Sequence, residues 1–563
     1  MDMGWQFWRS LALAVVVVLT VGIPTVGYVA HGLDQRFWPT GAFGFGTWLG
    51  APLEGGWRGL FDMGRVVWSM AVEDDFPDLP GRGNEVGAAL AAVTMLLTVW
   101  WSPTPRVEPE RDRSDVLGGA DWASEAETKR LNRGLELGTD PCTERVVRVP
   151  IEGNLLTVAP PRSGKSMGLI VPNLVAPDPE SWDGPAVVFD PKGELHRIVG
   201  RRRREIAECH GRRVLCLDPF GIAGGTDRWN PLDGIDANAT GAFLALAGGL
   251  VVDPGEQNQY FRRRAIGLVA GLLSAMVEAD VGRTLAGASD LLSDLPRLEG
   301  LAKASRTRAG RRLSGLLALA PGTRDPLLSS AETAFEWLLD EVMEASTSAS
   351  TFAMRDVARG DADLFLCLPA DRMEEQAPWL RMVLMDLMRA ARRERRPGDP
   401  RVVAFVDEAA SLGRFGELRR AVGELPGSGL SLWTFWQSRG QIESLHDRGG
   451  AKTFRDAAAV WTAQNVPPGE EAEAWSRMLG NYTAPVRSRG TGERAGQDTV
   501  SPQAVPLLAA SAVAELPHET ILAFLRGDGA TRRPLKLTRA NPHQERRFAG
   551  LLDADEERPP RIG

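Results

Sequence analysis

The segment from Ala159 to Ser166 carries residue types at a spacing that suits the binding of phosphate groups. It reads Ala-Pro-Pro-Arg-Ser-Gly-Lys-Ser, close to the G-x-x-x-x-G-K-[ST] pattern of nucleotide-binding loops. Backbone N–H groups of such a loop, together with the start of the next helix, form a nest for phosphate oxygens. We expect Lys165 to reach the outer phosphates and the Ser166 hydroxyl to ligate Mg²⁺. The residues expected to bind the nucleotide are Ala159, Arg162, Ser163, Gly164, Lys165 and Ser166.

The loop departs from the usual pattern at Ala159, where the first glycine normally stands. Alanine in that place costs strain only if the backbone needs a positive φ angle. The apolar run Leu155–Val158 predicts a strand before the loop, and Met167–Leu174 predicts the helix after it. A chance Gly-Lys-Ser loop is the alternative interpretation.

Two carboxylates at the end of a second apolar run supply the other groups that a nucleotide site needs. Arg401 is followed by the run Val402–Val406 and then by Asp407 and Glu408. In a nucleotide-hydrolysing site, Asp407 would support Mg²⁺ and Glu408 would polarise the attacking water. A strand that ends in Asp-Glu is common, so its weight comes from its pairing with the loop at 159–166. Together the two segments predict a protein that binds ATP and Mg²⁺ and hydrolyses ATP.

The elements that must position these residues alternate between strands and helices. The strand-like runs are Leu155–Val158, Ala186–Phe189, Val214–Leu217, Leu364–Leu368, Val402–Val406, Leu430–Phe435 and Val460–Thr462. This alternation predicts an α/β fold with a parallel sheet and helices on both of its faces. Residues 257–349 interrupt the alternation with a purely helical pattern, which predicts an all-helical inserted lobe.

Composition narrows the class of protein. The chain has 563 residues, enough for two or three domains, and a formal net charge of -8. A negative balance argues against a protein that coats nucleic acid by bulk charge, although it leaves room for a local basic channel. The four cysteines are scattered without a C-x-x-C pair, so neither a disulfide framework nor a zinc site is indicated.

The first hundred residues predict a membrane anchor. Leu11–Ala30 carries no charge and is long enough to span a bilayer as a helix, and Val86–Trp101 is a shorter second candidate that would otherwise be a buried helix. A cleaved signal peptide is disfavoured because Asp2 lies in the positively charged region that such a peptide needs. Because ATP is cytoplasmic, we expect a two-span membrane protein with most of the chain in the cytoplasm.

The expected layout has six parts. They are a membrane anchor with two transmembrane helices and a periplasmic loop (1–105), a linker and peripheral segment (106–148), the first part of the nucleotide-binding core (149–256), the helical lobe (257–349), the second part of the core (350–545) and a tail (546–563).

Five segments in order resemble type IV secretion coupling proteins of the TraG/TraD conjugation family. They are Ala159–Ser166, Val187-Val-Phe-Asp-Pro-Lys-Gly-Glu194, Leu217-Asp-Pro with Trp229-Asn-Pro-Leu232, the Asp407 strand with Ser411-Leu-Gly413, and Trp433-Thr-Phe-Trp-Gln-Ser438. The resemblance implies a RecA-like P-loop NTPase core, a homo-hexamer, and a helical lobe that binds cargo. It implies as partners single-stranded DNA, a relaxase–DNA complex or an effector protein, together with the membrane and the channel components of the secretion system. It also implies that Gln437 acts as a catalytic sensor of the γ-phosphate; a surface glutamine at a strand end is the alternative.

One departure from the family concerns an arginine. Coupling proteins commonly carry an Arg-Gly-aromatic-Gly segment before the sensor strand, whose arginine reaches the neighbouring subunit's nucleotide, whereas this chain has Pro426 in that place. We expect another arginine to substitute, with Arg439 first and then Arg419 or Arg420. Two other functions stay open: a DNA translocase like FtsK, and a docking receptor with little ATPase activity.

Overall fold

The computed structural model describes residues 115–255, 258–489, 498–527 and 531–553. The expected membrane anchor at 1–105 therefore lies outside the described residues. Within the described ranges, no helix is both long and apolar enough to cross a membrane.

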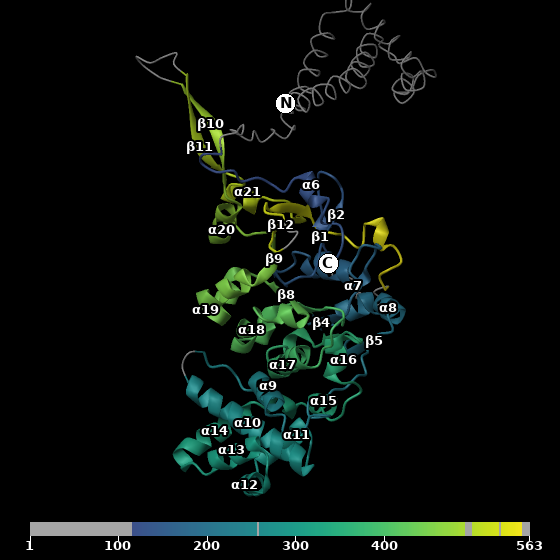
Figure 1. Cartoon of the computed structure of the whole chain (residues 1–563), viewed down its shortest axis with the longest axis vertical. Coiled ribbons are helices and arrows are strands. Elements are labelled where there is room, and N and C mark those ends of the chain that lie inside the picture. The colour runs from purple at the N-terminus through teal and green to yellow at the C-terminus, as the bar shows by residue number, and fades with distance from the viewer. Residues whose placement is uncertain (1–114, 256–257, 490–497, 528–530, 554–563) are drawn as a thin grey trace, which may run out of the picture. The chain divides into compact units, whose positions relative to one another are not determined.

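An eleven-stranded sheet forms the centre of the described chain (Figure 1). Its strands, in spatial order, are β2 (Val146–Val149), β1 (Leu135–Thr139), β13 (Leu535–Thr538), β12 (Thr520–Leu525), β9 (Ala458–Gln464), β3 (Asn154–Val158), β8 (Leu430–Trp436), β7 (Val402–Val406), β4 (Ala186–Asp190), β6 (Ala362–Cys367) and β5 (Arg213–Leu217). The seven strands from β9 to β5 are parallel to one another. They coincide with the seven strand-like runs of the sequence.

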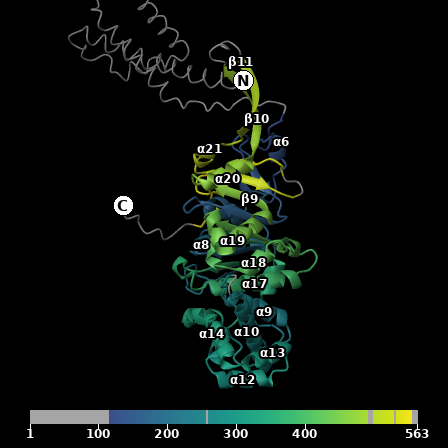
Figure 2. The ribbon, with the colours of Figure 1, turned by 90° about the vertical axis from the view of Figure 1, so that its left-hand side faces the viewer.

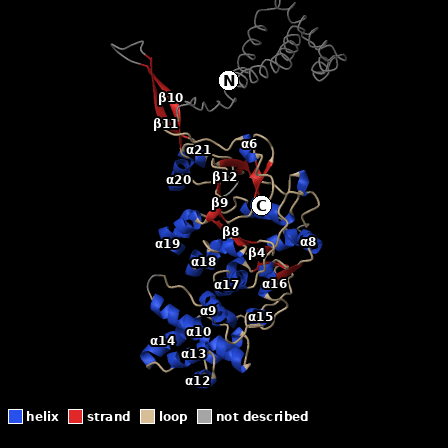
Figure 3. Ribbon diagram, viewed as in Figure 1, coloured by secondary structure: helices blue, strands red, loops and turns tan. Residues whose placement is uncertain are grey.

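The central strands are mostly apolar because both faces of the sheet are covered. Every residue of β3, β4, β7 and β8 is buried. Successive side chains alternate between two cores: Val187 and Phe189 pack into one, and Ala186 and Val188 pack into the other. Figure 3 shows helices flanking the strands.

The helices divide between those two cores. One core includes residues of the π-helix η2 (Ser166–Ile170), α7 (Val171–Val175) and α8 (Glu194–Cys209). The other includes residues of α9 (Thr240–Leu250), α16 (Met354–Arg359), α17 (Ala377–Arg393), α18 (Gly416–Ala421), α19 (Arg439–Asp456) and α20 (Glu470–Leu479). Short elements complete the described part: α6 (Glu125–Thr128), α21 (Ala510–Ala514), the 3₁₀ turns η4 (Ala370–Arg372), η5 (Ala409–Leu412), η6 (Leu425–Ser428) and η8 (Arg546–Phe548), and an antiparallel ribbon of β10 (Asn481–Arg489) and β11 (Asp498–Pro506).

The sequence predicts a linker over 106–148, but from Leu135 onward the chain belongs to the sheet. Strands β1 and β2 pair antiparallel with each other, and β1 pairs with β13. These strands are four or five residues long and carry buried charged side chains, which hide the apolar pattern expected of a core strand. The tail expected from residue 546 likewise begins with packed residues, since Phe548 is buried.

Residues 258–349, here called the helical lobe, contain helices and no strand in the structure. The helices are α10 (Gln259–Ala279), α11 (Leu285–Leu292), α12 (Leu295–Ala304), α13 (Arg308–Leu317), α14 (Pro321–Thr333), the 3₁₀ turn η3 (Glu336–Leu339) and α15 (Glu341–Ser346). Side-chain oxygens cap the amino ends of α11, α12, α13 and α15 by accepting a hydrogen bond from a backbone N–H of the first turn.

The lobe joins the core through α10, which packs on α9 (Figure 2). Arg262 of α10 and Glu417 of α18 form a buried ion pair with 2.8 Å between Nη1 and Oε1. Both ends of the lobe beyond α10 return to Asn230: its Nδ2 lies 2.7 Å from the Arg283 carbonyl oxygen, and its backbone N–H donates to Ser350 Oγ at 2.9 Å. The chain therefore enters and leaves the helices α11 to α15 at one place, beside Asn230.

Candidate nucleotide-binding site

Three neighbouring strands bring the sequence-predicted site residues together. The order β3-β8-β7 places the ends of these parallel strands at one edge of the sheet. The loop 159–166 follows β3, Asp407 and Glu408 follow β7, and Gln437 follows β8. The carboxyl edge of a parallel sheet is where ligands of α/β proteins bind.

The loop conformation explains why alanine serves in place of glycine at its start. Gly164 and Arg162 have positive φ angles of 76° and 61°, whereas Ala159 is not among the residues with positive φ. Its backbone N–H donates to the Trp436 carbonyl oxygen at 2.8 Å, which ties the loop to β8. Ala159 is therefore unstrained, and the departure from the usual pattern has no conformational cost.

The last two residues of the loop, Lys165 and Ser166, contact the carboxylate of Asp407. Ser166 Oγ donates to Asp407 Oδ2 at 2.5 Å, and Lys165 Nζ lies 3.7 Å from Asp407 Oδ1. Burial raises the pKa of Asp407, against the opposing effect of Lys165. Asp407 Oδ1 and Ser163 Oγ are both buried without a hydrogen-bond partner in the structure.

These oxygens suit a divalent cation. Mg²⁺ prefers hard oxygen ligands and is usually held by one or two protein groups plus phosphates and waters. The Ser166 hydroxyl and the Asp407 carboxylate are adjacent, and the second carboxylate oxygen, Oδ1, has only the more distant Lys165 ammonium beside it and no hydrogen bond. The residues present therefore fit Mg²⁺ bound together with a phosphorylated ligand.

Glu408 is held by three side chains from three segments. Gln437 Nε2 lies 3.0 Å from both carboxylate oxygens, Lys165 Nζ lies 3.3 Å from Oε2, and Gln441 Nε2 lies 3.4 Å from Oε1. Glu408 itself has φ of 62°, in the left-handed region that a non-glycine residue rarely occupies. Such strained positions cluster at functional sites, where surrounding contacts hold them.

The Asp-Pro-Lys-Gly-Glu segment forms a strand-end turn. Asp190, at the end of β4, accepts hydrogen bonds from the backbone N–H groups of His196 at 2.9 Å and Lys192 at 3.4 Å. Burial raises the pKa of Asp190 to about 6. Its hydrogen bonds fix the start of α8, which is a structural role.

Sequence reasoning missed two residues of the site, Gln441 and Arg539. Gln441 lies one helical turn beyond Gln437, and its Oε1 accepts a hydrogen bond from the Gln437 backbone N–H at 3.0 Å. Arg539, which follows β13, donates from Nη1 to the Ser163 carbonyl oxygen at 2.9 Å. A lone arginine more than 370 positions from the loop gives no spacing signal.

The arginines expected to replace the missing family arginine all have carboxylate partners in the structure. Arg439, Arg419 and Arg420 pair with Glu443 at 3.1 Å, Asp447 at 2.8 Å and Glu417 at 3.1 Å. Beside Pro426 lies another arginine, Arg401, whose Nη1 donates to the Pro426 carbonyl oxygen at 2.7 Å. The structure gives Arg401 no ion pair within its described residues. It contributes to an open hollow of about 520 Å³ that is also lined by Arg392, Arg395 and Arg396.

Comparison with known families agrees with the site. Residues 151–550 match the family model described as Type IV secretory system Conjugative DNA transfer, a match that covers more than half of the chain. The chain belongs to this family. The expected membership of the coupling-protein family is thereby confirmed, and the match includes the loop, the Asp407 strand and Gln437.

Two curated relatives show how far the similarity extends. Protein VirD4 of Rhizobium rhizogenes is 24% identical over 417 residues, which cover 71% of this chain and 60% of VirD4. Conjugal transfer protein TraG of Escherichia coli is 26% identical over 471 residues, which cover 74% of this chain and 72% of TraG. The match thus spans about 60% of the length of the VirD4 relative.

Solved structures share the fold. The unbound bacterial conjugative coupling protein TrwBΔN70 is 17% identical with a TM-score of 0.60, and the match covers 79% of this chain and 97% of TrwB. TrwB in complex with ADP and Mg²⁺ is 17% identical with a TM-score of 0.58, covering 79% of this chain and 99% of TrwB. The expected α/β core with a mostly parallel sheet is confirmed.

Proposed function

We propose that this chain is a membrane-anchored ATPase that recruits DNA or nucleoprotein and drives it into a type IV secretion channel. The observation that carries the proposal is the convergence of Lys165, Asp407 and Glu408 at one edge of the sheet. Family membership supplies the secretion context. A TrwB structure that contains ADP and Mg²⁺ supports the same ligands for this chain.

Each residue of the site has a chemical role in the proposal. Lys165 and the backbone N–H groups of the loop bind the phosphates, and Ser166 and Asp407 hold Mg²⁺. When bound, Mg²⁺ neutralises charge on the phosphates. Glu408 accepts a proton from the attacking water, and Gln437 orients Glu408 through its amide at 3.0 Å.

The Lys165 contacts suggest how the site responds to ligand. In the structure, Lys165 Nζ lies between two carboxylates, 3.7 Å from Asp407 and 3.3 Å from Glu408. Phosphate oxygens compete for the same ammonium group, since their charge is higher than that of a carboxylate. Binding of ATP would therefore release Glu408 from Lys165 and leave its oxygens available to water.

The remaining parts of the proposal follow from the family and from the layout of the chain. Residues 1–105 would anchor the protein in the bacterial inner membrane, with the core in the cytoplasm. The helical lobe would select cargo, because none of the proposed nucleotide-binding residues lies in it. In a homo-hexamer, the surface of one subunit would face the nucleotide bound to the neighbouring subunit.

Replacing Lys165 with alanine tests the proposal. We expect the Lys165→Ala protein to insert in the membrane and fold normally, because the side chain has no role in the apolar core, and to lose ATP hydrolysis and cargo transfer. ATP turnover of the purified full chain is the measurement. Turnover at the parental rate would show that the site is assigned wrongly, and parental transfer without turnover would favour the docking receptor.

A further inference from the structure

Arg539 lies across the phosphate-binding loop although it comes from the far end of the chain. Its Nη1 donates to the Ser163 carbonyl oxygen at 2.9 Å. Its side chain runs along Gly168 and Gly164, where an added Cβ would collide with the arginine stem and guanidinium respectively. Glycine inside a helix costs about 1 kcal/mol relative to alanine. The contact with Arg539 gives a reason for that cost at Gly168, in the first turn after the loop.

The guanidinium of Arg539 retains unused hydrogen-bonding capacity at this place. An arginine has five N–H donors, and in the described part of the chain the guanidinium makes one hydrogen bond, to Ser163, and no ion pair. The side chain of Ser163 is itself completely buried, and its hydroxyl has no partner there. An unneutralised cation and an unpaired hydroxyl thus adjoin the phosphate nest, where each has a use once an anion is bound.

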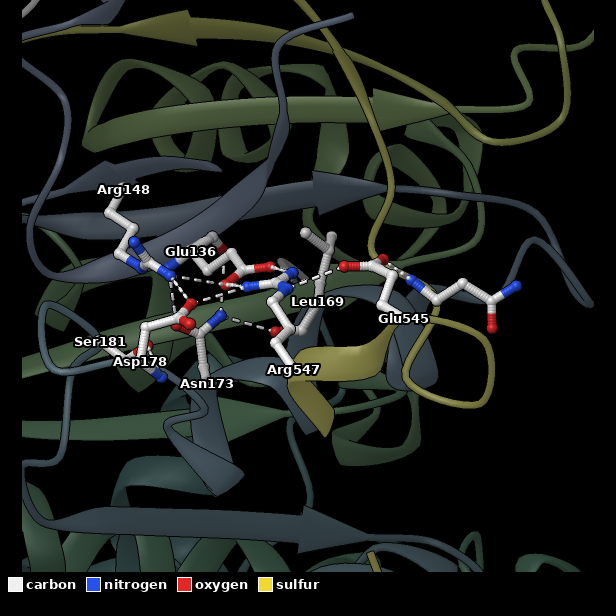
Figure 4. Close-up of polar contacts among 9 residues, drawn as sticks. Glu136, Arg148, Leu169, Asn173, Asp178, Ser181, Glu545 and Arg547 are labelled. Carbon is white, nitrogen blue, oxygen red and sulfur yellow. Dashed lines mark hydrogen bonds and ion pairs between the residues drawn. The ribbon is translucent and has the colours of Figure 1, made fainter. Parts of the chain in front are cut away.

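The segment that carries Arg539 is fixed by a buried charge network (Figure 4). Arg547 donates to both carboxylate oxygens of Glu136, at 2.5 and 2.7 Å, and to Asp178 at 3.1 Å. Glu545 accepts from Arg547 Nε at 2.8 Å. Because Glu136 lies on β1, this network attaches the C-terminal segment to the strand next to the edge strand β2.

The same network reaches the helix that follows the loop. Asn173 of α7 accepts from the Glu136 backbone N–H at 2.7 Å and donates to the Glu136 carbonyl oxygen at 2.9 Å (Figure 4). It also donates to the Leu169 carbonyl oxygen at 2.7 Å, one turn earlier in the helix. The loop helix and the C-terminal segment are therefore locked to the same residue of β1. The backbone N–H of Arg539 donates to the Glu519 carbonyl oxygen at 2.7 Å, so Arg539 is also tied to the residue just before β12.

We propose that Arg539 is a nucleotide-binding residue that contacts the phosphate chain from the C-terminal side of the loop. It adds a second cation to Lys165, in the same subunit, and the C-terminal segment completes the site. Its ligand class is a nucleoside di- or triphosphate, so the proposal rests on the proposed function. If Arg539 only supported the loop, its single hydrogen bond to Ser163 would be enough. If Arg539 binds nucleotide, its positive charge and its remaining N–H donors are also required.

The test measures binding rather than turnover. Affinities for MgATP and MgADP are determined on the full chain for the parent, Arg539→Gln and Arg539→Lys, with Lys536→Ala as a control. Lys536 is an exposed cation on β13, three residues before Arg539, and no hydrogen bond or ion pair joins it to the loop among the described residues. We expect Arg539→Gln to weaken both ligands about 10- to 100-fold, the value of one or two charge-assisted hydrogen bonds. The thermal midpoint of the nucleotide-free protein should change little.

The lysine variant separates binding from support. Lysine keeps the charge and one donor but loses the planar fork, so Arg539→Lys should recover only part of the affinity. Full recovery by lysine, or a lowered thermal midpoint in the nucleotide-free glutamine variant, would indicate loop support and overturn the proposal. Parental affinity in Arg539→Gln would overturn it as well. If both Arg539→Gln and Lys165→Ala bound MgATP at the parental affinity, the proposed function would fail together with the role of Arg539. If only Lys165→Ala lost binding, the role of Arg539 alone would be rejected.

Discussion

Replacing Glu408 with glutamine separates ATP hydrolysis from ATP binding. The substitution keeps the size and the left-handed backbone of the residue, whose φ is 62°, and removes the negative charge and with it the ability to accept a proton. A positioned general base contributes about 10²- to 10⁴-fold to a rate. We therefore expect kcat to fall by at least about 100-fold, which corresponds to roughly 2.7 kcal/mol of transition-state stabilisation.

The contacts of Glu408 predict that binding and folding change far less. Its side chain is 27% exposed, and Lys165 keeps Asp407 as a partner at 3.7 Å. A partly exposed ion pair of this kind is worth about 1 kcal/mol or less. The amide of Gln437 still finds one oxygen acceptor on glutamine. MgATP affinity should stay within roughly fivefold of the parent, which is about 1 kcal/mol.

The assay compares turnover and equilibrium binding of the purified full chain. Glu473→Gln is a matched control, because Glu473 is an exposed carboxylate in the first turn of α20 without a contact to the site in the structure. We expect control turnover to equal that of the parent. The reasoning is refuted if Glu408→Gln retains more than a tenth of parental turnover, or if it loses MgATP binding together with turnover.

Three further results are expected. Arg401 lies beside Pro426 and has no ion pair in the described part of the chain, so we expect it to act as the arginine finger. In the assembled oligomer, Arg401→Ala should lower ATP turnover by about 10³-fold or more, as loss of an arginine finger does, while alanine at Arg419, Arg420 or Arg439 should change turnover little. Equal losses of turnover in all four variants would contradict this assignment. Residues 285–346 lie between Arg283 and Ser350, which both bond to Asn230. Replacing residues 285–346 with a short glycine bridge should leave MgATP affinity unchanged and abolish cargo pull-down; pull-down at the parental level would refute cargo selection by the lobe. Burial lowers the pKa of His446 to about 4 from 6.5. As the pH falls, the unfolded state therefore takes up a proton on this imidazole before the folded state does. The contribution of His446 to the free energy of unfolding is fully present above pH 6.5 and falls by about 3 kcal/mol as the pH approaches 4. His446→Leu should flatten that dependence in thermal unfolding measured against pH, and an unchanged slope would exclude His446 as its source.

The parallel half of the sheet was predictable from the sequence because its strands are buried on both faces. Runs such as Val402–Val406 contain no polar residue, and helical stretches separate them. The antiparallel half was not predictable by the same rule. Strand β1 carries Glu136 and β2 carries Arg148, and both charges are buried in a network completed by Arg547, which lies about 400 residues further along the chain.

The residues of the site also differ in whether the sequence alone could indicate them. Lys165, Ser166, Asp407 and Glu408 lie in short motifs at strand ends, so local spacing indicates them and the parallel topology brings them together. Arg539 belongs to no motif. The local clue to it was Gly168, a glycine inside an otherwise apolar helix start, which signals that another group approaches closely.

Runs of arginine show what one-dimensional charge patterns leave undetermined. Arg201, Arg203 and their neighbours form one basic run in the sequence. In the structure, Arg203 is fully buried against Asp363 at 2.7 Å, while Arg201 is half-exposed and bonds to Asp553 at 2.8 Å. Both arginines are neutralised within the described chain. An arginine available to a phosphate is therefore recognised by its lack of a carboxylate partner, as with Arg539 and Arg401, and not by the number of its basic neighbours.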